Sequence, residues 1–180
     1  MTDQPLRLMF QDEARFGLIG DPRRCWAPFP LRPLVKIEIV QQFSYAYAAL
    51  SPHDGTLDSL ILPHVDGSCM EIFLQDLGRR HEKENILLVL DGAGWHHSRQ
   101  VRIPDNIRLV FLPPYSPDLN PVEHFWEELR EKYFHNVLFQ SLSSLDDQLE
   151  TGLRDYEQNP EKMVALTSWD WIKNIILNAK

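Results

Sequence analysis

The sequence predicts an α/β domain in which helices flank a mixed central sheet. Short β-rich runs fill the first half of the chain, and the second half alternates apolar runs with segments of helical period. Strands first, followed by strands alternating with helices, are typical of a layered domain. The chain has 180 residues, of which 43% are hydrophobic, and no linker-like segment divides it, so we expect one domain over residues 1–180.

Four strands are predicted before the first helix. They lie at residues 6–10, 34–40, 43–50 and 57–62, the middle two as adjacent antiparallel strands. The first is expected to end at the polar residues Gln11, Asp12 and Glu13. Glycines and prolines in residues 16–33 predict a loop, with one short strand around residues 24–27. A turn is expected at residues 51–55, where Gly55 permits a positive φ.

Helices and apolar strands alternate in the second half. Residues 68–80 are expected to form an amphipathic helix, because Met70, Phe73, Leu74 and Leu77 recur at helical spacing. The runs 86–90 and 107–112 are apolar without alternation, as expected of strands covered on both faces. Further helices are predicted at residues 121–135, 142–156 and 161–177, the last with a break near residues 169–171.

A proline-rich stretch, L-P-P-Y-S-P-D-L-N-P-V-E-H-F-W at residues 112–126, joins the last predicted strand to a helix. Its prolines prevent regular structure up to Asn120. Asn120 suits the N-cap, Pro121 the first helical position, and Glu123 the first turn, where the helix dipole favours a carboxylate. The inward face of this helix is predicted to carry Val122, Phe125, Trp126, Leu129 and Tyr133.

The net charge of −8 argues against a protein that coats nucleic acid non-specifically, because phosphate neutralisation needs Lys and Arg. The first 36 residues differ, with six basic and four acidic residues, so a polyanion is expected to approach there. No apolar run of membrane-spanning length and no signal-peptide pattern occur. Cys25 and Cys69 have no C-x-x-C spacing. These features predict an intracellular protein without a disulfide framework.

Three carboxylates occupy similar positions next to predicted elements. Asp12 and Asp91 each follow an apolar strand, and Glu123 begins the helix after a third. Neighbouring strands lie about 4.8 Å apart, so acids at the ends of adjacent strands can converge on shared cations. Oxygen-only ligands favour Mg²⁺ or Mn²⁺ over zinc, and two such ions can promote in-line attack at phosphorus.

Each of these acids also has a structural interpretation. Asp12 is in range to pair with Arg15 in a loop, and Asp91 with Gly92 has the pattern of an ordinary strand-ending turn. Glu123 is suitably placed to be the capping-box partner of Asn120. The residues alone leave these alternatives open.

Three segments, Q-D-E-A-R-F-G, L-V-L-D-G-A-G-W-H-H-S and the proline-rich stretch, together resemble the catalytic domain of bacterial insertion-sequence transposases of the mariner superfamily, the DDE type. R-R-C-W-A-P at residues 23–28 and W-D-W-I at residues 169–172 extend the resemblance over essentially the whole chain. It implies a ribonuclease-H-like fold and Mg²⁺- or Mn²⁺-dependent DNA strand cleavage and strand transfer. It also implies that Asp12, Asp91 and Glu123 are the catalytic triad, which holds two metal ions.

The sequence departs from the family pattern in three places. Gly92 stands where many relatives have Asn after the second Asp, and Pro30 stands where a glycine is expected after W-A-P. The N-terminal helix-turn-helix region is absent before Asp12. We therefore interpret the chain as a split reading frame, a truncated copy or a fragment, and we expect transposon-end recognition to need a separate DNA-binding polypeptide.

Several other residues are candidates for the site. His96 is a candidate auxiliary residue near the scissile phosphate, whereas His96 and His97 lack a third ligand at zinc spacing. The candidate contacts to DNA phosphates are Arg15, Arg23, Arg24 and Arg99. The alternative is that these arginines are ordinary solvated surface charges. Trp26 and Trp95 are candidates for stacking on an unpaired base, but core positions are more usual for aromatic residues.

The predicted function is the catalytic step of DNA transposition, in which water attacks a transposon end and the released 3′-hydroxyl attacks target DNA. One alternative is a ribonuclease-H-like nuclease that does not join strands. Another is a catalytically silent remnant that modulates full-length transposase. The expected partners are DNA and a second copy of the chain on DNA, with no membrane. The expected location is the bacterial cytoplasm, with nucleoid association when bound to DNA.

Overall fold

A computed structural model describes residues 4–18, 24, 26–32, 34, 40–92 and 101–178. Its strands are β1 (Leu6–Gly17), β2 (Phe43–Leu50), β3 (Leu57–Leu62), β4 (Asn85–Leu90) and β5 (Ile107–Phe111). Its helices are α1 (Gly67–Arg80), the short 3-10 helix η2 (Pro117–Leu119), α2 (Pro121–Tyr133), α3 (Leu142–Glu157), α4 (Pro160–Thr167) and α5 (Asp170–Asn178). None of the helices in the described ranges has the length and apolar character needed to cross a membrane.

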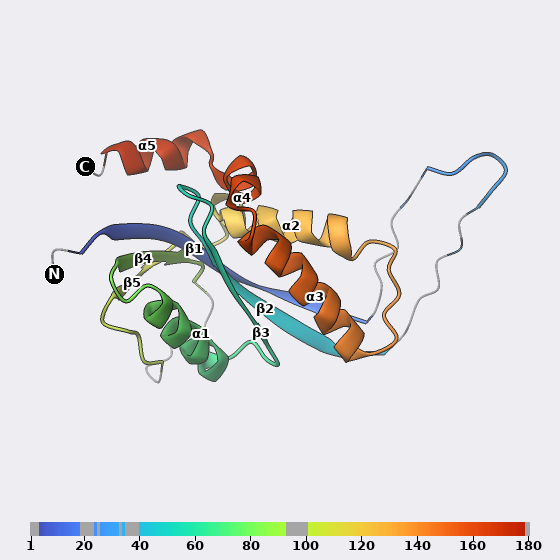
Figure 1. Ribbon diagram of the computed structural model, residues 1–180, viewed down its shortest axis with the longest axis horizontal. Coiled ribbons are helices and arrows are strands. Elements are labelled where there is room, and N and C mark those ends of the chain that lie inside the picture. Colours follow the sequence, from blue (N-terminus) through green and yellow to red (C-terminus); the bar gives the residue numbers. More distant parts are fainter. Residues whose placement is uncertain are drawn as a thin grey trace.

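The five strands form one mixed sheet in the order β3-β2-β1-β4-β5. The β1, β2 and β3 strands pair antiparallel, whereas β4 and β5 join β1 by parallel pairing. Helix α1 covers one face of the sheet, and α2, α3 and α4 lie over the other (Figure 1). This arrangement confirms the predicted α/β fold with a mixed central sheet.

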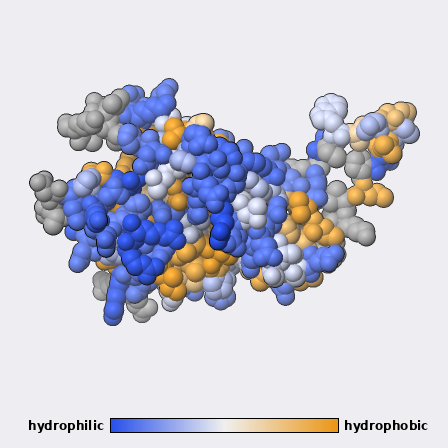
Figure 2. All heavy atoms as spheres, in the orientation of Figure 1, coloured by the Kyte–Doolittle hydropathy of each residue, from blue (hydrophilic) through white to orange (hydrophobic). Residues whose placement is uncertain are grey.

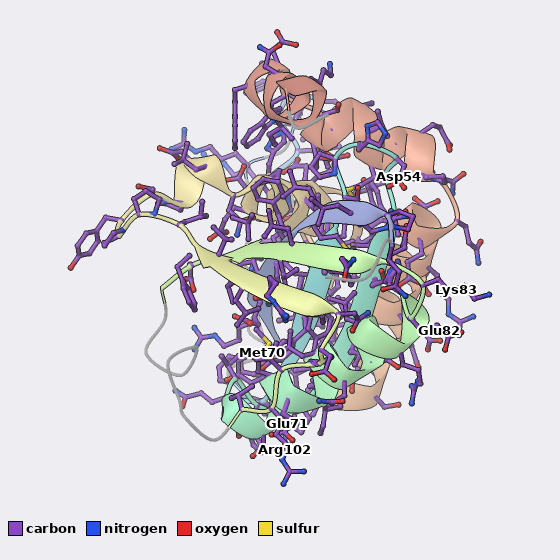
Figure 3. All side chains as sticks on the ribbon, turned by 90° about the vertical axis from the view of Figure 1, so that its left-hand side faces the viewer. Asp54, Met70, Glu71, Glu82, Lys83 and Arg102 are labelled. Carbon is purple, nitrogen blue, oxygen red and sulfur yellow. The ribbon has the colours of Figure 1, made fainter. Side chains whose placement is uncertain are left out.

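Separate cores fill the two faces of the sheet, because successive side chains of each strand point to opposite sides. On the α1 side, Met9 and Leu88 pack with Phe73 and Leu74. Met70 of α1 is also buried in this core. The next residue, Glu71, accepts a hydrogen bond from the Arg102 backbone N–H at 3.3 Å, which joins α1 to the segment before β5 (Figure 3). The core on the α2 side contains Phe10, Ala14 and Phe16 of β1 together with residues of α2, α3 and α4.

Strand β1 runs further than predicted, and this corrects the position of Asp12. The prediction ended the strand at residue 10, but it continues to Gly17, so Asp12 lies in mid-strand. Pairing with β4 ends at Phe10, whereas pairing with β2 continues to Gly17. Backbone pairing with β2 sustains the strand through polar residues, because ladder hydrogen bonds do not depend on side-chain polarity.

Two other strand predictions were wrong. The β5 strand is an edge strand that is largely exposed, with 41% of Val110 accessible, rather than covered on both faces. Of its residues only Ile107 is buried, whereas Arg108, Val110 and Phe111 are exposed. The short strand around residues 24–27 does not form in the described residues there. Most of the strand predicted at residues 34–40 lies outside the described residues.

The predicted helices are confirmed, including the break between α4 and α5 at Ser168 and Trp169. The predicted N-cap is also confirmed, because the Asn120 side chain accepts a hydrogen bond from the Val122 backbone at 3.2 Å. Gly55 has the expected positive φ, at 75°.

The face shown in Figure 2 is largely hydrophilic with several hydrophobic areas, one of which lies on the segment that projects beyond the end of β1 and the start of β2 (Figures 1 and 2). Trp26 and Phe29 in this segment are fully exposed. The interpretation of Trp26 as a core residue is therefore wrong.

Candidate active site

The three predicted carboxylates line one pocket of about 460 Å³ at the end of β4 and the start of α2. Asp12 comes from β1, Asp91 follows β4 directly, and Glu123 lies in the first turn of α2. Much of the remaining wall is formed by residues 112–117, the first part of the proline-rich stretch. The structure thus brings the three acids to one pocket, while their catalytic and metal-binding roles stay predictions.

Sheet register explains why Asp12 and Asp91 reach the same pocket. Phe10 pairs with Val89 in the parallel ladder, and each acid lies two residues further along the chain, Asp12 within β1 and Asp91 directly after β4. The chain leaves the sheet after Leu90, which opens the space beside Asp12. Glu123 reaches this space from the first turn of α2. The N-cap of this helix, Asn120, donates a hydrogen bond to the Gln11 carbonyl of β1, which holds the start of α2 close to β1.

Asp12 is partly buried beside α2. It shares its face of β1 with Phe10 and Ala14, and its Oδ2 accepts a hydrogen bond from Trp126 Nε1 at 3.1 Å. Burial raises the pKa of Asp12 to about 8, and the negative charges of Glu123, Glu13 and Asp91 add to the rise. Arg15 points to the other face of β1, so the loop ion pair with Asp12 is not formed.

Glu123 is exposed at the pocket, and it does not close a capping box. The Asn120 backbone N–H donates to the Pro117 carbonyl at 2.8 Å instead of to Glu123. Partial desolvation raises the pKa of the Glu123 carboxyl, the positive charge of Arg130 opposes this rise, and the charge of Asp91 adds to it. The first turn of α2 therefore leaves the Glu123 carboxylate available to the pocket.

Gly92 follows Asp91 directly after β4. In the described residues, Gly55 is the glycine with a positive φ, and a Cβ at Gly92 would meet no atom within 4 Å. The residues that would complete the predicted strand-ending turn, 93–100, lie outside the described residues, so the turn at Asp91 and Gly92 stays an open interpretation.

The donor set suits a hard divalent cation. Three carboxylates line one pocket, the charge of Asp91 raises the pKa of both Asp12 and Glu123, and a bound cation would offset this repulsion. In the described ranges, no group of three or more His, Cys, Asp or Glu side chains is close enough together to hold a metal ion. The fit therefore rests on the chemistry of the donors and their shared pocket.

The other candidates do not line this pocket within the described residues. Arg15 is exposed and lies over the Phe43 ring, with 4.6 Å between its Cζ and the ring centroid. Arg24 is exposed. The remaining candidates, Arg23, Trp95, His96, His97 and Arg99, lie outside the described residues.

Sequence reasoning missed the part that Trp126 and Asn120 play beside Asp12. Trp126 was predicted as a core residue only, and it is buried, but its indole N–H contacts the Asp12 carboxylate. A buried tryptophan usually finds a hydrogen-bond partner for this group, and that rule was the available signal.

The pH dependence of stability is expected to reveal the buried Asp12 carboxyl. Its pKa is about 8 in the folded protein, against about 3.9 in an unfolded chain, so folding favours the protonated form. Its stabilising contribution is complete below about pH 4 and is lost as the pH rises to about 8. In EDTA, Asp12→Asn should be more stable than the wild type at pH 8.5 by on the order of 2–4 kcal/mol, with little difference at pH 4.5.

Urea denaturation at the two pH values, followed by tryptophan fluorescence, measures this difference. Global charge effects are common to both proteins and cancel in the comparison. If the free energies of unfolding of the two proteins change with pH in the same way, the raised pKa of Asp12 in the folded protein is contradicted.

The mixed sheet in the order β3-β2-β1-β4-β5, with helices on both faces, is a ribonuclease-H-like fold. Residues 7–146 match the family model described as DDE superfamily endonuclease, and the chain belongs to this family. The family and fold together are those of a DDE transposase catalytic domain, which confirms the resemblance noted in the sequence.

Relatives with known sequences support this assignment. The uncharacterized protein y4pE/y4sA of Sinorhizobium fredii (strain NBRC 101917 / NGR234) is 32% identical over 130 residues, which cover 72% of this chain and 96% of that protein. The transposable element Tcb2 transposase of Caenorhabditis briggsae is 24% identical over 156 residues, or 79% of this chain and 57% of that protein.

Solved structures of the Mos1 transposase share the fold. The Mos1 strand transfer complex has a TM-score of 0.61 at 17% identity, covering 91% of this chain and 55% of that chain. The Mos1 paired end complexes with Mn and with Mg have TM-scores of 0.60 and 0.61 at 18% and 17% identity, each covering 91% of this chain and 56% of that chain. The chain thus spans little more than half the length of the Tcb2 and Mos1 proteins.

Proposed function

We propose that this chain catalyses metal-dependent cleavage and strand transfer of DNA in transposition. The observation that carries the proposal is the meeting of Asp12, Asp91 and Glu123 at one pocket of a DDE-family fold. The acids come from a central strand, the end of its neighbour and the start of a helix, which gives each a fixed backbone. A site built on such elements holds its side chains more precisely than one built on loops.

Mg²⁺ or Mn²⁺ is the proposed cofactor, held as two ions by Asp12, Asp91 and Glu123. When bound, such ions activate the attacking oxygen and stabilise the leaving oxygen of an in-line displacement at phosphorus. Hard cations of this kind prefer carboxylate oxygens, and the pocket supplies three carboxylates. The Mos1 complexes with Mn and Mg support this choice of metal.

The chain's own residues prepare the pocket for this chemistry. Asp12 must lose its carboxyl proton before it can bind a cation, so metal binding should release a proton near neutral pH. The wall at residues 112–117 contains three prolines, which limit backbone motion beside the acids. Asn120 and Trp126 contact β1 next to Asp12 and close the pocket on the core side.

DNA is the proposed substrate, as both transposon end and target. We further propose that a second copy of the chain joins it on DNA, because paired ends need paired sites. A separate DNA-binding polypeptide with a helix-turn-helix region is the proposed source of end recognition, and the bacterial cytoplasm is the proposed location.

A strand-joining assay tests the proposed function against the nuclease and remnant alternatives. The chain is incubated with supercoiled plasmid, a labelled oligonucleotide with a free 3′-hydroxyl, and Mn²⁺. Nicked plasmid and label joined to plasmid DNA are both expected, and EDTA should abolish both. Nicking without joining would favour the nuclease, and neither product would favour the catalytically silent remnant.

A further inference from the structure

Helix α2 is attached to β1 at two adjacent residues, and these attachments flank the position of Glu123 in the sequence. Asn120 contacts Gln11, and Trp126 contacts Asp12. Glu123 lies between Asn120 and Trp126 in the sequence. The segment of α2 that carries Glu123 therefore also makes the hydrogen bonds to β1, the strand that carries Asp12. The separation of the two carboxylates is thereby tied to these contacts.

Asn120 makes the first attachment with both ends of its side-chain amide. Its Nδ2 donates to the Gln11 carbonyl at 2.9 Å, and its Oδ1 accepts from the Val122 N–H at 3.2 Å. The side chain is 3% exposed, so neither bond competes with much water. Gln11 directly follows Phe10, the last β1 residue that pairs with β4. At this point Asn120 of the helix cap, rather than a residue of β4, donates to the β1 backbone.

Trp126 makes the second attachment directly to the carboxylate. Its indole N–H donates to Asp12 Oδ2 at 3.1 Å, and the residue is 1% exposed. The ring packs against Phe125 and edge-on to Phe16, with centroids 4.9 and 6.1 Å away. A ring held on several sides presents its N–H in one direction, which fixes the carboxylate that accepts it.

The spacing on α2 makes the second contact effective. Trp126 lies three residues after Glu123, about one helical turn along α2, and its side chain reaches Asp12 of β1. The hydrogen bond is made to Oδ2 of a carboxylate that also lines the pocket. Hydrogen bonds of this kind orient metal ligands, and their loss typically weakens metal binding or activity about 10- to 100-fold.

We infer that Trp126 and Asn120 are positioning residues, which set the Asp12 carboxylate relative to Glu123 for metal-dependent DNA cleavage. This inference rests on the proposed function. Trp126 acts on the Asp12 carboxylate directly, and Asn120 acts on the β1 backbone at the preceding residue, Gln11. The helix that supplies the third acid therefore also aligns the first.

Two conservative substitutions separate this role from packing alone. Trp126→Phe keeps an aromatic ring and removes the N–H, and Asn120→Ser keeps a capping hydroxyl and removes the donor to Gln11. The matched controls are Tyr156→Phe, which removes the hydrogen bond to Glu128 of α2, and Asn106→Ser, which removes bonds to the Gly78 and His81 carbonyls. All four remove part-buried or buried hydrogen bonds.

Mn²⁺ affinity is measured by calorimetry at a temperature where each variant is fully folded by circular dichroism. The expected result is a Kd about 10- to 100-fold higher for the two site variants, and within about 2-fold of wild type for the two controls. Plasmid cleavage by the site variants should show a lower kcat at an unchanged KM for DNA. Wild-type Mn²⁺ affinity in folded Trp126→Phe would overturn the inference.

The indole N–H signal of Trp126 keeps the inference testable without metal. Trp126→Phe assigns its ¹H–¹⁵N cross-peak, which should move in Asp12→Asn and stay in Asp105→Asn. If wild-type protein binds no Mn²⁺, the proposed function fails while a moving cross-peak still supports the contact. An unmoved cross-peak in Asp12→Asn overturns the inference whatever the metal does.

Discussion

Replacing Asp91 by Asn is expected to lower the rate of Mn²⁺-dependent plasmid cleavage by on the order of 10³-fold or more, about 4 kcal/mol of activation free energy. Asn keeps the size of the side chain and removes the negative charge that would hold a cation. Asp91 is exposed at the mouth of the pocket, directly after β4, so the fold does not depend on its burial. The loss should therefore appear in the rate while the melting temperature changes little.

Asp105→Asn is the matched control for this prediction. Asp105 is also an exposed aspartate next to a strand, but it precedes β5 and lines a different pocket. It should cleave at the wild-type rate. Single-turnover nicking rates for the three proteins decide the matter, and equal rates for Asp91→Asn and wild type would remove Asp91 from the catalytic site.

Gly55→Ala is expected to destabilise the fold by about 2–5 kcal/mol. Gly55 has a φ of 75°, in the turn between β2 and β3, where residues with a side chain are strained. An added Cβ would also lie 2.0 Å from the Pro160 carbonyl oxygen and 2.7 Å from its carbonyl carbon. Both obstacles are backbone, at the first residue of α4, so no side-chain rotation relieves them.

Gly92→Ala is the control for this effect. Its Cβ would meet nothing within 4 Å, so we expect a change within about 0.5 kcal/mol. Thermal unfolding followed by circular dichroism should show Gly55→Ala melting roughly 5–15 °C below wild type. A melting temperature for Gly55→Ala equal to that of Gly92→Ala would mean that the turn does not pack on α4 in this way.

The sequence was sufficient to predict most of the fold because its periodicities were local. Met70, Phe73, Leu74 and Leu77 marked α1, and all four are buried. The strand errors have a common cause. Whether residues 11–17 continue β1 depends on the partner strand β2, and whether β5 is covered depends on its place at the sheet edge. Neither fact can be read from the apolar runs themselves.

The sequence was sufficient to predict which acids form the candidate site, but it predicted only part of the way in which they are arranged. Carboxylates beside predicted strand and helix ends, together with the family motifs, led to Asp12, Asp91 and Glu123. The parallel register that aligns Asp12 with Asp91 is a long-range property of the sheet. The contact between Trp126 and Asp12 joins residues 114 positions apart, so no spacing rule within α2 could have found it.

The central claim is that the three acids act together on a divalent cation. The most direct test is a calorimetric Mn²⁺ titration of the wild-type chain alongside Asp12→Asn, Asp91→Asn and Glu123→Gln. We expect saturable binding by the wild type and a Kd raised at least about 10-fold in each variant, because each removes one carboxylate from the shared pocket. Absence of binding by the wild type, or binding that all three substitutions leave unchanged, would contradict the claim.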